Sequence, residues 1–184
     1  MMPHFRMQAA AVALGIVMTA GFAAAQDAGP PAVKPGAELK MLERMVGTWD
    51  AVTTMHGMPP SKGVETNRLM GGLWVVSEFT GDMGGQKFEG HGLYGYDPDK
   101  KKYVGVWVDS QTTSVTISEG GLSADGKTLT LTGEMKNPIG DGMVTINFVD
   151  TFTDADTRAF AMKMAMPGGG GDVDMMTIAY KRRK

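Results

Sequence analysis

The residues with the clearest capacity for chemistry are a histidine and nearby carboxylates on alternating, strand-like stretches. Successive side chains of a strand point to opposite faces, so His91 shares a face with Glu89, and Glu78 shares one with Trp74. A histidine beside a carboxylate can perform general acid–base catalysis, because its unperturbed pKa of about 6.5 lies near neutral pH. If these faces turn inward, we expect His91, Glu78 and Asp109 to form one polar group.

The stretch from Tyr103 to Asp109 predicts one wall of a binding pocket. It places three valines on one strand face and Tyr103, Trp107 and Asp109 on the other. Aromatic walls with a few convergent polar groups are typical of small-molecule sites. The candidate ligand-binding residues are Arg68, Trp74, Glu78, His91, Tyr96, Trp107 and Asp109. An alternative interpretation assigns these residues to cross-strand ion pairs, turns and the protein surface.

Several catalytic classes have no support in the sequence. The serines form neither a G-x-S-x-G elbow nor an S-x-x-K motif, which argues against a serine hydrolase. The chain has no cysteine, three histidines and no H-E-x-x-H, which argues against a zinc enzyme. We therefore predict no cofactor and no metal site, and we assign no catalytic residue.

Methionine is unusually frequent, with 17 residues in the chain. Thioethers suit Cu(I), and the run from Met55 to Met58 contains His56. However, Met162 and Met164 share a strand face with Phe160, where methionine is a common filler of cores and apolar pockets. We expect these methionines to line a core or a pocket.

The first 25 residues have the pattern of a secretory signal peptide. A basic start with Arg6 precedes an apolar stretch and a small-residue cleavage site that ends at Ala25. This predicts a periplasmic or secreted protein without a transmembrane segment. Residues 26–36 are rich in Pro, Ala and Gly and predict a flexible leader, and residues 37–184 predict one domain.

The charge balance excludes one class of partner. The chain carries 18 Lys and Arg against 20 Asp and Glu, a formal net charge of −2. Nucleic-acid-binding domains usually present a basic face, and here the one basic cluster is the terminal Lys181–Lys184. We expect no nucleic-acid partner; the composition specifies neither the ligand nor the oligomeric state.

Hydrophobic periodicity predicts a short helix followed by about ten strands. Apolar residues recur at helical spacing over Ala37–Val46, and after Gly47 the period changes to two. The expected strands are Trp49–Met55, Val64–Met70, Leu73–Thr80, Lys87–Tyr94, Tyr103–Asp109, Ser114–Glu119, Thr128–Glu134, Met143–Thr153, Arg158–Met166 and Asp172–Lys181. Asp97–Lys100 and Asp125-Gly126 predict tight turns. Short connections between consecutive strands favour an all-β, up-and-down antiparallel barrel, with a two-sheet sandwich as the alternative.

A set of motifs makes the chain similar to the DUF1579 family of bacterial proteins of unknown function. The matching motifs are Leu42–Trp49, Met70–Val75, Gly81–Met83, Phe88–Gly90, Gly95–Asp97, Trp107–Ser110 and Ser118–Gly120. The resemblance implies a calycin or lipocalin-like barrel, because Gly47-x-Trp49 after a short helix is similar to the start of those proteins. The chain also starts like nitrobindin-like haem barrels, but no histidine follows His91 to bind haem.

These observations predict an exported barrel that holds a small, largely apolar ligand. One alternative is an envelope scaffold or interaction module whose barrel is filled by side chains. The other is an enzyme that uses His91 with a carboxylate.

Overall fold

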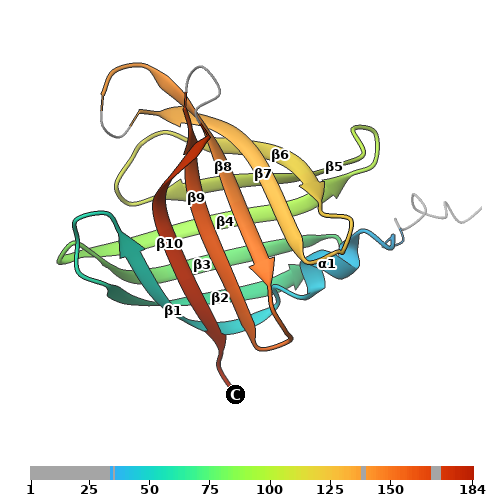
Figure 1. Ribbon diagram of the computed structural model, residues 1–184. Helices are drawn as coiled ribbons and strands as arrows, with labels where there is room; N and C mark the ends of the chain where they lie inside the picture. Colours follow the sequence, from blue (N-terminus) through green and yellow to red (C-terminus); the bar gives the residue numbers. More distant parts are fainter. Residues whose placement is uncertain (1–33, 35, 138–139, 167–170) are drawn as a thin grey trace, which may run out of the picture. The chain divides into compact units, whose positions relative to one another are not determined.

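Ten antiparallel strands close into a barrel with one short helix. The computed structural model describes residues 34, 36–137, 140–166 and 171–184. Each strand pairs with its neighbour in sequence, and β1 pairs with β10 to complete the barrel (Figure 1). The elements are α1 Leu39–Glu43, β1 Gly47–Met55, β2 Ser61–Met70, β3 Trp74–Met83, β4 Gln86–Asp97, β5 Lys102–Asp109, β6 Thr116–Leu122, β7 Thr128–Lys136, β8 Met143–Phe152, β9 Thr157–Ala165 and β10 Asp172–Arg182. The predicted all-β, up-and-down barrel is confirmed.

The helix is shorter than the predicted range of residues 37–46. It covers Leu39–Glu43, and a tighter turn follows, in which the Met45 N–H donates to the Leu42 carbonyl at 3.0 Å. The predicted apolar stripe is present, because Leu39, Leu42 and Met45 are all buried. The chain then enters β1 at Gly47, whose φ of 123° suits glycine.

Two apolar clusters lie in the barrel interior. The first joins α1 to inward residues of the strand ends around it, including Val75, Tyr103 and Phe152. The second lies among inward residues of β1, β3, β4 and β10, including Trp49 and Phe79. The helix therefore packs on the barrel at the end where β1 begins.

The predicted turns have the expected geometry. The Asp97 carboxylate accepts hydrogen bonds from the backbone N–H groups of Asp99 at 3.0 Å and Lys100 at 3.1 Å. Gly126 has a φ of 69°, which glycine adopts without strain. These local signals account for the short connections that make consecutive strands antiparallel neighbours.

The predicted signal peptide lies outside the described residues, as does all of the predicted leader except residues 34 and 36. Within the described part of the chain, we find no helix with the length and apolar character needed to cross a membrane.

Candidate functional site

The barrel encloses a cavity of about 290 Å³. Its wall consists of inward-facing residues from many strands. The aromatic members are Phe79, Phe88, Tyr94, Trp107, Phe148, Phe160 and Tyr180, and the methionines are Met45, Met55, Met83, Met135, Met162 and Met176. This volume lies at the lower end of the range for small-molecule sites, which is about 300–1,000 Å³. The lining matches such a site, because it is mainly apolar and aromatic with few polar groups.

Glycines at inward positions create room for the aromatic wall. A Cβ atom on Gly90 would lie 2.2 Å from Cζ2 of Trp107, and one on Gly92 would lie 2.7 Å from Cε2 of Tyr94. Both distances are far below van der Waals contact, so these rings lie directly against the backbone of β4. On the next strand, a Cβ atom on Gly105 would lie 3.0 Å from the Tyr94 ring. The missing side chains thus leave space in the barrel centre.

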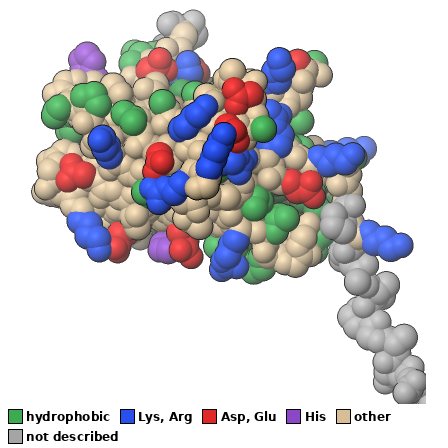
Figure 2. Space-filling view, turned by 90° about the horizontal axis from the view of Figure 1, so that it is seen from below, with side chains coloured by type: hydrophobic (Ala, Val, Ile, Leu, Met, Phe, Trp, Pro, Cys, Tyr) green, Lys and Arg blue, Asp and Glu red, His purple; other side chains and the backbone are tan. Residues whose placement is uncertain are grey.

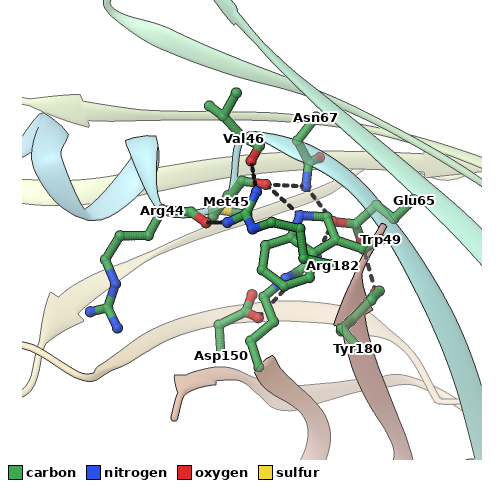
Figure 3. Close-up of polar contacts among 10 residues, drawn as sticks. Arg44, Met45, Val46, Trp49, Glu65, Asn67, Asp150, Tyr180 and Arg182 are labelled. Atoms are coloured by element: carbon green, nitrogen blue, oxygen red, sulfur yellow. Dashed lines mark hydrogen bonds and ion pairs between the residues drawn. The ribbon is translucent and has the colours of Figure 1, made fainter. Parts of the chain in front are cut away.

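A buried ionic network forms one part of the cavity wall (Figure 3). We call this part, which consists of Glu65, Asp150 and Tyr180, the inner end of the cavity. The Glu65 carboxylate accepts hydrogen bonds from Arg158 Nη2, from the Tyr180 hydroxyl at 2.7 Å and from Asn67 Nδ2 at 2.5 Å. Arg158 Nη1 donates to Asp150 Oδ1 at 2.8 Å. The side chains of Arg158, Glu65 and Asp150 are only 1%, 8% and 14% exposed. Glu65, Asp150 and Tyr180 line the cavity, whereas Arg158 lies behind them.

Aromatic rings hold the two arginines of this region. The Arg158 guanidinium lies 3.8 Å from the centroid of the Tyr180 ring and 4.9 Å from that of Trp49. The Arg182 guanidinium lies 4.0 Å from the centroid of the Trp49 ring. Both arginines therefore contact Trp49. Such cation–π contacts strengthen when they are desolvated, as they are at the buried Arg158.

Burial dominates the electrostatics of the network. Burial raises the pKa of Asp150, and the negative charge of Glu65 raises it further, although Arg158 acts in the opposite direction. Burial, followed by the charge of Glu65, raises the pKa of both Tyr94 and Tyr180. Burial disfavours the charged form of Arg158, but Glu65 and Asp150 outweigh this effect and raise its pKa. Arg158 and both tyrosines therefore keep their protons at neutral pH.

Two of the predicted site residues, Trp107 and Asp109, line the cavity. Trp107 Nε1 donates a hydrogen bond to Asp109 Oδ2 at 3.1 Å, and the Gln111 N–H donates to Asp109 Oδ1 at 2.9 Å. Their strand has the predicted alternation: Tyr103 is buried, Trp107 and Asp109 line the cavity, and Val108 of the other set is exposed. Val106 is exposed as well, but it also contributes to the cavity lining.

Three predicted residues, Arg68, Glu78 and His91, are exposed. Glu78 and His91 lie opposite each other in the β3–β4 pair, but on its outer face, because Ser77 and Phe79 take the inward positions of β3. The structure thus brings this histidine and carboxylate together outside the barrel and away from Asp109. Figure 2 shows that acidic and basic side chains are distributed over the displayed face of the molecule.

The other two predicted residues, Trp74 and Tyr96, pack elsewhere. Trp74 covers Gly95, whose added Cβ would lie 2.4 Å from the indole ring. Tyr96 packs against the cluster around α1 and makes an edge contact with Tyr103, with 5.2 Å between ring centroids. Neither residue is among those that line the cavity. A ligand-binding role for the seven predicted residues stays a prediction.

The buried network is absent from our sequence-based candidates, although the sequence carries a signal for part of it. Arg158 lies on the same strand face as Phe160 and Met162, because these residues are two positions apart. Asp150 shares a face with Phe148 for the same reason. A charged residue in phase with an apolar face indicates a buried, paired charge. The identity of the partners has no such signal, because Glu65 and Arg158 lie 93 residues apart.

Residues 34–182 match the DUF1579 family, described as a protein of unknown function. Among solved structures, the crystal structure of Rv2717c from M. tuberculosis is similar, with a TM-score of 0.55 and 12% identity over 82% of this chain and 100% of that chain. The S-type phycobiliprotein lyase CPES from Guillardia theta has a TM-score of 0.47 and 12% identity over 82% and 99% of the two chains. The search of curated proteins gives no match. The likeness to Rv2717c supports the barrel fold.

Proposed function

The chain belongs to the DUF1579 family of proteins of unknown function, and we propose that it binds a small, largely apolar molecule inside the barrel. The cavity carries this proposal. Protein interiors are normally packed with few voids larger than a water molecule, so an empty volume of about 290 Å³ needs an explanation. Gly90 and Gly92 supply one, because the absence of their side chains lets rings lie directly against the wall.

The lining defines the chemistry of the ligand. Aromatic, methionine and aliphatic side chains together form most of the wall, which favours an apolar body. Methionine is flexible and polarisable, so it adapts to ligands of irregular shape. Polar groups are in the minority, and they include Asp109 and the inner-end residues Glu65, Asp150 and Tyr180, which would orient the ligand.

We further propose that the protein is exported. This rests on the sequence of residues 1–25, which has a basic start, an apolar centre and a cleavage site. Fractionation of the native host should recover the protein from the periplasm or the medium. Its N-terminal residue should be Gln26 in peptide sequencing, and an intact Met1 terminus on protein in the cytoplasm would contradict export.

No observation favours either alternative function, the filled scaffold or the enzyme that uses His91. A filled scaffold is disfavoured by the cavity, although Val108 of β5 and Ile117 of β6 are exposed. An enzyme that uses His91 is disfavoured because this side chain is exposed on the outer face. Ligand binding is therefore the function that the geometry supports best.

Titration with N-phenyl-1-naphthylamine, an uncharged fluorescent probe of apolar sites, tests the proposal. We expect saturable fluorescence enhancement with the wild-type protein. Ser118→Phe places a ring in the lining and should abolish the enhancement, whereas Ala159→Phe adds a ring at an exposed position of β9 and should not. Circular dichroism establishes that both variants are folded. Absence of binding to the wild type, or equal binding to a folded Ser118→Phe variant, would overturn the proposal.

A further inference from the structure

The ionisable residues that line the cavity are all acids. Within the described part of the chain they are Glu65, Asp109 and Asp150 together with the phenols of Tyr94 and Tyr180, and no lysine, arginine or histidine lines it. A ligand with a negative charge would find no basic side chain on this surface. A ligand with a positive charge would find carboxylates at the inner end and near Trp107.

Several polar groups of the lining have no hydrogen-bond partner among the described residues, and two of them are one oxygen of Asp150 and the hydroxyl of Ser118. Asp150 Oδ1 binds Arg158, but nothing donates a hydrogen bond to its other oxygen, Oδ2. Ser118 is only 7% exposed, lines the cavity, and its hydroxyl has no partner. Buried polar groups are normally paired, so each of these groups is available to a ligand.

The charges of the inner end do not balance when both carboxylates are ionised. Glu65 and Asp150 share one cation, Arg158, whose guanidinium is held by ring contacts with Tyr180 and Trp49. One negative charge then remains in an apolar enclosure, where an unpaired charge is costly. A proton or a cationic ligand would remove this cost.

From this arrangement we propose that the ligand is an amphipathic organic amine, with an apolar body along the aromatic wall and its ammonium group at Asp150. This inference rests on the proposed ligand-binding function. The ammonium would donate to Asp150 Oδ2, and its positive charge would gain from aromatic rings of the cavity wall. The same residues disfavour fatty acids and other carboxylates, because a carboxylate would meet only acidic ionisable groups on the cavity wall.

Binding of an amine should release a proton. Burial raises the pKa of Asp150, so in the empty barrel this carboxyl keeps its proton to a higher pH than an ordinary aspartate does. The charged groups that face it are Arg158 of β9 and Glu65 of β2, and the phenol of Tyr180 on β10 adjoins Glu65. An ammonium stabilises the ionised form, so amine affinity should rise as pH increases through the pKa of Asp150. The affinity of an uncharged ligand should not follow this rise.

Three probes with the same ring system test the inference: 1-naphthylmethylamine, 1-naphthylmethanol and 1-naphthoate. Their dissociation constants are measured at about pH 7 by displacement of N-phenyl-1-naphthylamine. We expect the amine to bind about tenfold more tightly than the alcohol, and the carboxylate to bind most weakly. Asp150→Asn should lower the affinity for the amine to about that for the alcohol, and it should leave the affinity for the alcohol unchanged. The control Asp50→Asn, at an exposed position, should leave this order unchanged.

The outcomes separate the two proposals. Binding of neither the amine nor the alcohol would contradict ligand binding itself. If the alcohol binds as tightly as the amine, or if the carboxylate binds most tightly, only the proposal that the ligand is an amine would be overturned. Calorimetry of the wild type in two buffers with different ionisation enthalpies gives a test that needs no variant. We expect net proton release with the amine at pH values near the pKa of Asp150 and none with the alcohol, and equal values for both would overturn the inference.

Discussion

Arg158 is the residue on which the inner end of the cavity depends. Its guanidinium is paired with two carboxylates and contacts two aromatic rings, and almost none of its side chain is exposed. A buried ion pair contributes little net stability by itself, because desolvation offsets the attraction. Removal of one partner is costly, however, because it leaves a buried charge without compensation.

Glu65→Ala is therefore expected to lower the free energy of unfolding by about 3–5 kcal/mol. Urea denaturation measures this loss. Glu65→Gln should cost less, because its amide oxygen still accepts a hydrogen bond from Arg158. Glu119→Gln removes a carboxylate that pairs with Lys100 and Lys102 on the surface, and it should leave the urea midpoint unchanged. A wild-type midpoint for Glu65→Ala would show that the network carries no stability.

Strand β4 shapes the cavity through residues that lack side chains. Gly90 and Gly92 lie at inward positions, and their place is taken by Trp107 of β5 and by Tyr94 two residues along β4. Glycine costs entropy in a strand interior, so its repeated use at inward positions indicates that space is needed there.

Gly90→Ala should push the Trp107 ring into the cavity, because the new Cβ would lie 2.2 Å from Cζ2 of that ring. We expect a destabilisation of about 1–3 kcal/mol and weaker binding of N-phenyl-1-naphthylamine. Thermal unfolding and probe titration measure the two effects. The matched control is Gly121→Ala, since a Cβ at Gly121 meets no atom within 4 Å and no positive φ requires glycine there. Unchanged probe affinity in Gly90→Ala would contradict this role of Gly90.

At the scale of the whole molecule, the barrel closes where the first strand meets the last. Arg182 reinforces this closure: its guanidinium donates to the carbonyls of Val46, of Arg44 at 3.0 Å and of Ala155 at 2.8 Å. It also lies over the Trp49 ring. One side chain at the end of β10 thus joins the segment after α1 to the β8–β9 turn.

Arg182→Ala should lower the free energy of unfolding by about 2–4 kcal/mol, since charge-assisted hydrogen bonds and a cation–π contact are lost together. Hydrogen exchange should show the largest loss of protection along the β1–β10 pair. The neighbouring Arg183→Ala is the control, because Arg183 forms an exposed pair with Asp50. Equal effects of the two substitutions would rule out a special role for Arg182.

Local patterns in the sequence determined the strands, the turns, the short helix and the orientation of Trp107 and Asp109. Each depends on residues close together in the chain: an alternation of period two, a turn residue or a helical stripe. Whether Glu78 and His91 point into or out of the barrel depends on which side of β3 and β4 the core lies. The sequences of these two strands do not contain that information.

Only the tertiary structure decided the cavity and its acidic inner end. Tyr180 donates to a carboxylate 115 residues away, and Arg158 pairs with the same Glu65 from another strand. The register of strands distant in sequence sets these contacts, and it also places the Trp107 ring over Gly90. Local periodicity identifies inward residues, but the closure of the barrel selects which of them meet.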